Sequence, residues 1–246
     1  MKSYLILGGS SGIGLATARK LSIDHQVILV GKNQEKLKAA HDSLTQHCRQ
    51  GNCLSFACDL GELNHVQEIF SFLKKKHIRL DGMVYCAGIA PLCLLRDNTE
   101  ELMERVFRLN LFSFIECCRY FYQEEYSNNG SKIVGVASIT AHTSGYRQTL
   151  YGASKAAMTA AVRLMAKELL NREIKINCIS PGSVGTEMLQ GLYQSEEDLK
   201  ACVSKMQPLG VIPPERVADA IEMLLSPIAD YMTGNEYIYD GGTLLK

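Results

Sequence analysis

Tryptophan is absent from the 246-residue sequence, and its formal net charge is zero. No basic run is longer than Lys74–Lys76, so the sequence gives no electrostatic support to a nucleic-acid or anionic-membrane surface. No stretch approaches the roughly 20 apolar residues of a membrane span, and the apolar run Tyr4–Leu7 is too short for the core of a signal peptide. We therefore expect a soluble, cytoplasmic protein that binds neither nucleic acid nor membrane.

The nine cysteines include no C-x-x-C pair. Several of them, such as Cys86 and Cys178, lie within apolar runs, which is typical of small buried side chains in a reducing compartment. One cluster could be read as a zinc site: His47, Cys48, Cys53 and Cys58. Its spacing matches no zinc pattern, and Cys53 and Cys58 flank a predicted strand. We predict that the protein has no metal site.

The length and the alternation of apolar and helical segments indicate one α/β domain. A chain of 246 residues is long enough for a single large core and short for two domains, so we assign residues 1–246 to one domain. Strands are predicted at Tyr4–Leu7, Gln26–Val30, Leu54–Cys58, Gly82–Cys86, Ile133–Ala137 and Glu173–Ile179, with a closing strand within Met232–Gly242. Helices are predicted at Leu15–Leu21, Asn33–Gln50, Glu62–Lys76, Thr99–Tyr126 and Ala156–Leu170, with another from Pro213.

A glycine-rich turn connects the first predicted strand to the first helix. Strand, glycine loop and helix in this order are typical of the phosphate-binding turn of a dinucleotide-binding fold. Glycines let the backbone approach a pyrophosphate, whose charge is attracted by the amides at the helix N-terminus. The predicted cofactor contacts in this turn are Gly8, Ser10, Ser11, Gly12, Ile13 and Gly14.

The end of the second strand bears on the choice of cofactor. In this type of fold it faces the adenosine ribose, where an acidic residue holds the 2′-hydroxyl of NAD. Here the sequence is Gly31-Lys32-Asn33, which has no acid. Lys32 supplies a cation for the 2′-phosphate of NADP, or else it is an exposed lysine of the turn. We predict that NADP(H) is preferred over NAD(H).

Tyr151 and Lys155 lie four residues apart at the start of a long amphipathic pattern, so both side chains are expected on one helix face. A cation fixed near a tyrosine favours the phenolate and lowers the tyrosine pKa from its ordinary value of about 10. Such a tyrosine acts as a general acid or base. Ser138 follows the buried run Ile133–Ala137, at the end of the strand where ligands bind in open α/β sheets. We expect these three residues to share a catalytic site.

The spacing Ser-x12-Tyr-x3-Lys, with Gly152–Ser154 between the last two residues, resembles the catalytic core of the short-chain dehydrogenase/reductase family. The Gly-x3-Gly-x-Gly turn also resembles that family, and the resemblance covers the whole chain. It implies a single doubly wound, Rossmann-type parallel sheet of about seven strands with helices on both faces. It also implies hydride transfer between a nicotinamide cofactor and a carbonyl or alcohol carbon of a small molecule.

The resemblance gives each catalytic residue a role. Tyr151 exchanges the proton, Lys155 lowers the tyrosine pKa and holds the nicotinamide ribose, and Ser138 hydrogen-bonds to the substrate oxygen. Asn110 corresponds to the fourth catalytic residue, which holds a water molecule linking the lysine to solvent. Asparagine is a poor residue for a helix interior, so its place within the predicted helix Thr99–Tyr126 is also unusual on physical grounds.

Further cofactor contacts follow from the resemblance. The family places an aspartate against the adenine amino group, where this chain has Asp59 followed by Leu60. Tyr85–Gly88 replaces the usual Asn-Asn-Ala-Gly and keeps only its small residues, while Leu7 replaces the usual threonine. Pro181–Thr186 matches the Pro-Gly-x3-Thr turn around the nicotinamide carboxamide. With Tyr151 and Lys155, these predicted contacts are Asp59, Leu60, Cys86, Ala87, Gly88, Pro181, Gly182, Val184 and Thr186.

The substrate is selected mainly by residues 186–210, which we interpret as a substrate loop, and by residues 91–98. Reductases of the family that act on 3-oxoacyl carrier proteins bind the carrier through arginines near the ends of two interface helices. Arg172 matches one of these positions, but Ser127–Gly130 supplies no second arginine. An acyl-carrier substrate therefore remains an alternative that is not favoured.

Two further alternatives belong to other classes of function. A catalytically silent NADP-binding sensor is disfavoured by the complete Asn/Ser/Tyr/Lys set, and a sugar isomerase or epimerase on this fold is typically longer. The family also leads us to expect a homotetramer or homodimer. The helices that carry Asn110 and Tyr151 would form its interface, because they have apolar residues on more than one face.

Overall fold

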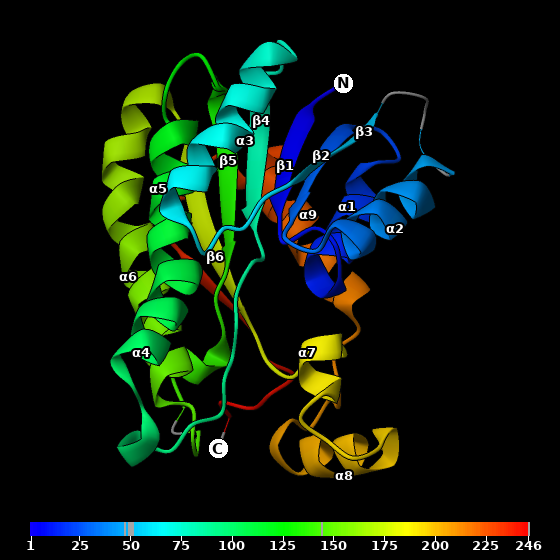
Figure 1. Cartoon of the computed structure of the whole chain (residues 1–246), viewed down its shortest axis with the longest axis vertical. Coiled ribbons are helices and arrows are strands. Elements are labelled where there is room, and N and C mark those ends of the chain that lie inside the picture. Colours follow the sequence, from blue (N-terminus) through cyan, green and yellow to red (C-terminus); the bar gives the residue numbers. More distant parts are fainter. Residues whose placement is uncertain (47, 49–51, 144, 246) are drawn as a thin grey trace.

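The computed structural model describes residues 1–46, 48, 52–143 and 145–245. Its centre is a seven-stranded, all-parallel sheet with the strand order β3-β2-β1-β4-β5-β6-β7 (Figure 1). This order confirms the predicted doubly wound sheet. The strands are β1 Ser3–Leu7, β2 Gln26–Gly31, β3 Cys53–Ala57, β4 Leu80–Tyr85, β5 Ser127–Val136, β6 Lys175–Pro181 and β7 Glu236–Tyr239.

The direction of winding reverses between β1 and β4. Leu7 of β1 pairs with Val30 of β2 on one side and with Tyr85 of β4 on the other, so the loops after β1 and β4 begin at the same level. A Cβ built on Gly8 would lie 2.7 Å from the backbone nitrogen of Ala87, so only glycine allows the two loops to approach this closely. Ligands bind at this kind of switch point in open α/β sheets.

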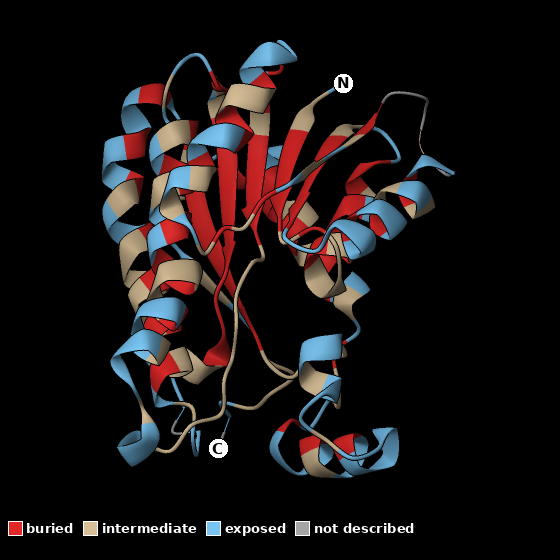
Figure 2. Ribbon diagram, viewed as in Figure 1, coloured by how far each residue is buried: buried red, intermediate tan, exposed pale blue. Residues whose placement is uncertain are grey.

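Helices cover both faces of the sheet and bury its strands (Figure 2). One face packs against α1 Gly12–Leu21, α2 Gln34–Thr45 and α9 Pro214–Leu225. The other face packs against α3 Leu63–Lys75, α5 Ser113–Phe121 and α6 Thr149–Leu169. Because both faces are covered, β1, β2 and β4 are almost continuous apolar runs, as expected of a parallel sheet.

The predicted helix Thr99–Tyr126 is interrupted, which corrects the sequence interpretation. It consists of α4 Glu100–Phe107, the π-helical turn η2 Arg108–Phe112 and α5, and it ends at Phe121. Asn110 lies in the π-helical turn, where the backbone leaves the regular pattern of hydrogen bonds. The anomalous asparagine therefore marks a local change of helix type within the segment.

Several other boundaries differ from expectation; strand β5 begins at Ser127 and not at Ile133, for example. The predicted helix Asn33–Gln50 ends at Thr45, and residues 47 and 49–51 lie outside the described part of the chain. Strand β6 begins at Lys175, because Glu173 adopts a left-handed conformation with a φ of 55° after the short 3-10 helix η4 Leu170–Arg172. The other 3-10 turns are η1 Leu95–Asp97, η3 Ile139–Ala141 and η5 Pro227–Ala229.

Two helices occupy much of the predicted substrate loop: α7 Glu187–Gln190 and α8 Glu196–Met206. They lie beyond the carboxyl end of β6, away from the body of the sheet (Figure 1). No helix in the described ranges combines the length and the apolar character needed to cross a membrane.

Candidate active site

Ser138, Tyr151 and Lys155 come together where β5 ends and α6 begins. Ser138 is the second residue after β5 and is 7% exposed. Tyr151 lies in the first turn of α6, with Lys155 one turn later. The Lys155 ammonium lies 5.9 Å from the centre of the Tyr151 ring. The predicted spacing of four residues therefore places the half-buried Tyr151 phenol beside the buried Lys155 ammonium.

The tyrosine pKa differs from the sequence-based expectation. Burial raises the pKa of Tyr151 above its ordinary value, and the neighbouring Ser138 hydroxyl opposes this shift only in part. Loss of solvent disfavours the charged phenolate, and the spacing of residues does not reveal this cost. The net shift of the tyrosine pKa is therefore opposite to the lowering expected from Lys155. Tyr151 carries its proton near neutral pH.

Lys155 is itself perturbed by the pocket. The residue is 4% exposed, and its ammonium donates a hydrogen bond of 2.7 Å to the carbonyl oxygen of Val136. Burial lowers the pKa of Lys155 to about 8. The carbonyl at the end of β5 thus fixes the lysine beside Tyr151 at some cost to its charged form.

Asn110 joins the π-helical turn to two other parts of the site. Its side-chain oxygen accepts a hydrogen bond of 2.9 Å from the Ile89 amide. Its side-chain nitrogen donates to the Ile89 carbonyl at 3.0 Å and to the Ser154 hydroxyl at 2.9 Å. The asparagine is fully buried, so these contacts hold the loop after β4 against α6 beside Lys155. A role of Asn110 in a proton relay remains a proposal.

Tyr85 has a function that the sequence analysis missed. Its hydroxyl donates a hydrogen bond of 2.6 Å to the carbonyl of Leu109, within the π-helical turn. Tyr85 is fully buried at the end of β4 and therefore connects the central sheet to the turn that carries Asn110. The departure from the family's Asn-Asn-Ala-Gly pattern thus coincides with a structural support for the site.

The glycine turn after β1 fits a pyrophosphate. Helix α1 begins at Gly12 with no acidic residue in its first turn and no side-chain hydrogen bond from its N-cap residue Ser11. Gly12 has a φ of 52°, and a Cβ built on it would lie 3.0 Å from a side-chain carbon of Thr186. The backbone amides at this helix start are suited to an anion. The predicted contact Ser10 lies in this turn, and Ile13 and Gly14 lie in the first turn of α1.

The adenosine end of the predicted cofactor site contains an ion pair. Lys32, just after β2, lies 2.6 Å from the carboxylate of Asp59, which follows β3. Burial alone would raise the pKa of Asp59, but Lys32 and the Gly61 amide bring it below the usual range. Leu60 is buried beside this pair. The two polar residues assigned separately to the cofactor are therefore in contact with each other.

The segment Pro181–Thr186, here called the β6 turn, is held by a residue that the sequence analysis missed. Gln207 is 1% exposed, and its side-chain oxygen accepts a hydrogen bond of 2.7 Å from the Ser183 amide. Its side-chain nitrogen donates to the Ser183 carbonyl at 3.2 Å. A Cβ built on Gly182 would lie 2.9 Å from the backbone carbonyl oxygen of Asp240, so glycine is favoured there. The sequence alone gives no signal for this role, because the burial of Gln207 is known only from the structure.

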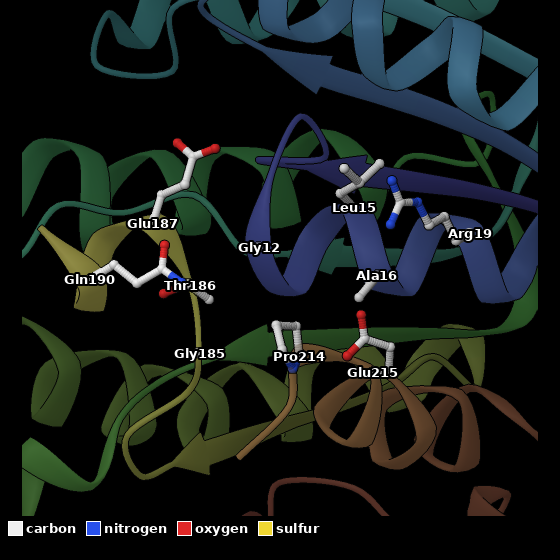
Figure 3. Close-up of a pocket in the computed structure, with 10 residues that line it drawn as sticks. All are labelled: Gly12, Leu15, Ala16, Arg19, Gly185, Thr186, Glu187, Gln190, Pro214 and Glu215. Atoms are coloured by element: carbon white, nitrogen blue, oxygen red, sulfur yellow. The ribbon is translucent and has the colours of Figure 1, made fainter. Parts of the chain in front are cut away.

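A cavity of about 220 Å³ lies between α1 and the end of the β6 turn (Figure 3). Gly12 and Arg19 line it from α1, and Gly185–Glu187 line it from the opposite side. Neither Ser138 nor Tyr151 lines this cavity. It therefore borders the glycine turn but not the residues proposed for proton transfer.

The described residues contain no group of three or more histidine, cysteine or carboxylate side chains placed to hold a metal ion. His47, one of the four residues considered above as a zinc site, lies outside the described residues. The absence of a metal site therefore remains a prediction. All nine cysteines are free. Burial raises the pKa of Cys86, beside the glycine turn, to about 12, so its thiol stays protonated.

Comparisons with known proteins identify the family. A profile described as Enoyl-(Acyl carrier protein) reductase matches residues 8–243. Carbonyl reductase family member 4 of Xenopus tropicalis is 32% identical over 100% of this chain and 99% of its own length. The 3-oxoacyl-[acyl-carrier-protein] reductase FabG of Chlamydia pneumoniae is 34% identical over 98% of this chain and 96% of its own length. A short-chain type dehydrogenase/reductase structure from Mycobacterium ulcerans has a TM-score of 0.91 at 27% identity, covering 100% of this chain and 90% of that one. The chain therefore belongs to the short-chain dehydrogenase/reductase family of oxidoreductases.

Proposed function

We propose that the protein reduces the carbonyl group of a small molecule with NADPH. The observation that carries this proposal is the placement of Tyr151 beside Ser138 and on the same helix face as Lys155, with the tyrosine pKa raised above its ordinary value by burial. Reduction of a carbonyl to an alcohol requires a proton donor at the oxygen. A tyrosine with a raised pKa is in the form that can donate.

In the proposed reaction, the Ser138 hydroxyl orients the carbonyl oxygen. Tyr151 transfers its proton to that oxygen as negative charge develops there. Lys155 lies 5.9 Å from the tyrosine ring and stabilises the phenolate that results. The nicotinamide cofactor, when bound, supplies the hydride for the carbonyl carbon. The glycine turn, Ala87 and Gly88 after β4, and Val184 and Thr186 of the β6 turn would hold the cofactor.

NADP(H) is the proposed cofactor because the end of β2 offers a cation and no acid. Gly31 cannot repel a 2′-phosphate, and Lys32 can pair with it. The present partner of Lys32 is Asp59, and the Lys32 side chain is 76% exposed. The phosphate therefore competes with a carboxylate in a solvated setting, so we expect a moderate preference.

A carrier-protein substrate gains little support from Arg172. Its guanidinium donates to Asn129 at 3.1 Å and to the Ser127 carbonyl at 2.8 Å, and it also contacts the Tyr122 carbonyl. The residue is 7% exposed, so these internal contacts leave it unsuited to bind an acidic partner. We therefore favour a free small-molecule carbonyl, although relatives of this chain are named 3-oxoacyl-[acyl-carrier-protein] reductases.

A substrate panel tests this function. Purified protein is incubated with NADPH and with ketones, free 3-oxoacyl thioesters, carrier-linked 3-oxoacyl thioesters and keto-sugars. We expect one NADPH to be oxidised for each alcohol formed with a free carbonyl compound. Faster turnover of the carrier-linked thioester than of its free counterpart would favour the carrier-protein alternative. Tight NADPH binding with no turnover of any compound would favour the silent sensor.

The remaining parts of the proposal concern assembly and location. We propose a homodimer or homotetramer formed through α5 and α6, and we keep residues 186–210 as the substrate loop. The nine free cysteines support a reducing compartment such as the cytoplasm.

A further inference from the structure

One carboxylate connects two walls of the proposed site. Glu236, the first residue of β7, lies 2.7 Å from the Nε2 atom of His142. The hydroxyl of Ser180 donates a hydrogen bond to the same oxygen of Glu236. The Glu236 side chain is 20% exposed, compared with 39% for His142. No step proposed above uses any of these three residues.

The position of Glu236 is fixed by the pairing of β7 with β6. Glu236 is the register partner of Cys178, whose amide donates to the Asn235 carbonyl at 2.9 Å. The amide of Asn235 in turn donates to the side-chain oxygen of Asn177 at 3.1 Å. The residue preceding Glu236 is therefore tied to β6 through both of its backbone polar groups. The carboxylate extends from a rigid edge of the sheet.

The two donors belong to the segments that carry the substrate and cofactor contacts. His142 ends the single 3-10 turn that begins after Ser138, and its amide donates to the Ile139 carbonyl at 2.8 Å. The amide of Ala141 donates to the Ser138 carbonyl at 3.1 Å, so Ser138 and His142 are rigidly connected. Ser180 immediately precedes Pro181, where the β6 turn starts.

Resting on the proposed reductase function, we propose that Glu236 is a positioning residue. One carboxylate oxygen of Glu236 accepts hydrogen bonds from both His142 and Ser180. Glu236 thereby fixes the position of the Ser138 hydroxyl relative to the β6 turn. Hydrogen bonds to an ionised carboxylate are stronger and shorter than neutral ones, which suits them to this task. A displacement of about 1 Å at a reacting group can reduce the rate by roughly 10²-fold.

The test compares Glu236→Ala and Glu236→Gln with the wild type, using NADPH and a reducible carbonyl compound. Glu236→Ala should lower kcat at least about tenfold, because it releases both donors. Glu236→Gln keeps a side-chain oxygen and should retain most of the activity. The dissociation constant of NADPH, measured by its fluorescence, should change less than about twofold, since its adenosine contacts are untouched. Glu125→Ala removes an exposed ion pair with Lys74 and serves as the control.

A double-mutant cycle with Ser138→Ala separates positioning from a general loss of structure. If Glu236 acts by positioning Ser138, then Glu236→Ala should reduce kcat much less in the Ser138→Ala background than in the wild type. Equal fold-losses in both backgrounds would overturn the inference. His142→Ala gives the same cycle without altering β7, should Glu236→Ala not fold.

The outcomes for this inference and for the proposed function are distinguishable. Wild-type kcat in both Glu236→Ala and His142→Ala, together with an inactive Tyr151→Phe, would refute the positioning role alone. An active Tyr151→Phe would refute the proposed mechanism and, with it, the role given to Glu236.

Discussion

Lys155 shows how strongly burial changes the chemistry of a single residue. Its four-residue spacing from Tyr151 can be found in the sequence, but the loss of solvent around both side chains cannot. The structure lowers the pKa of the lysine to about 8 and raises that of the tyrosine, in both cases because burial disfavours charge. The identities of these residues could be predicted from the sequence, whereas their protonation states required the fold.

The lowered pKa of Lys155 predicts a pH dependence of stability. The folded lysine loses its proton near pH 8, whereas an unfolded lysine keeps it up to about pH 10.5. The unfolded chain thus binds more protons in this interval, and the free energy of unfolding gains from Lys155 as the pH rises from about 8 to about 10.5. Below about pH 8 the full cost of the buried charge remains.

Urea titrations of the wild type and of Lys155→Met between pH 7.5 and 10 measure this contribution as a difference. The free energy of unfolding of the wild type should rise relative to that of the variant across the interval. Parallel pH profiles would show that Lys155 has an ordinary pKa in the folded protein.

Lys32 gives a prediction about cofactor choice. A charge-assisted contact is worth about 1.5–3 kcal/mol, and solvent exposure places Lys32 at the lower end of this range. Lys32→Ala should therefore weaken NADPH binding about tenfold and leave NADH binding nearly unchanged. Fluorescence titration of both cofactors measures this, with the exposed Lys38→Ala as the control. Equal effects on the two cofactors would show that Lys32 does not contact the 2′-phosphate.

Gly31→Asp is a less direct test of the same preference. It should weaken NADPH by placing a carboxylate beside the phosphate, but a Cβ at Gly31 would lie 3.0 Å from the Ser10 hydroxyl. A change in the glycine turn would then accompany the change in charge.

At the scale of elements, strands and helices were predicted well where apolar patterns are strong, as in β1, β2 and β4. The π-helical turn Arg108–Phe112 was not predicted, because helix periodicity continues through it without a break in composition. Asn110 was the only local sign of it. The supporting Tyr85 comes from a strand 24 residues away, a contact that no local pattern contains.

Tyr85→Phe tests the support of the π-helical turn. The variant keeps the ring but leaves the Leu109 carbonyl without its donor, so the free energy of unfolding should fall by about 1–3 kcal/mol. Chemical denaturation measures this loss, and Tyr231→Phe, on a fully exposed tyrosine, should have no effect. A Tyr85→Phe protein as stable as the wild type would show that the turn does not depend on this hydrogen bond.

At the scale of the whole molecule, the doubly wound parallel sheet of about seven strands, with helices on both faces, follows from the resemblance to the family and agrees with the structure. The sequence did not show which apolar side chains of these helices pack into the core and which remain exposed to a second copy of the chain. Phe114 and Phe121 pack into the core, whereas Phe112, Ile115 and Leu164 are exposed by 46%, 39% and 71%. Ile115 of α5, Leu164 of α6 and Phe112 at the end of η2 are therefore among the exposed apolar residues available to a second copy.

Leu164→Glu tests whether these exposed residues mediate self-association. A buried, unpaired carboxylate is costly, so the variant should shift the protein from an oligomer toward a monomer in light scattering at micromolar concentration. Ile23→Glu changes an exposed residue beyond α1 and should leave the molar mass unchanged. A wild-type protein that is itself monomeric under these conditions would contradict the predicted assembly.

The central claim is that Tyr151 donates the proton during reduction of a carbonyl, and Tyr151→Phe tests it most directly. The substitution preserves the ring and removes the transferable proton. General acid catalysis is typically worth about 10²–10⁴-fold, so kcat should fall by at least that order while the NADPH dissociation constant changes less than about twofold. Retention of more than about a tenth of the wild-type kcat would contradict the claim.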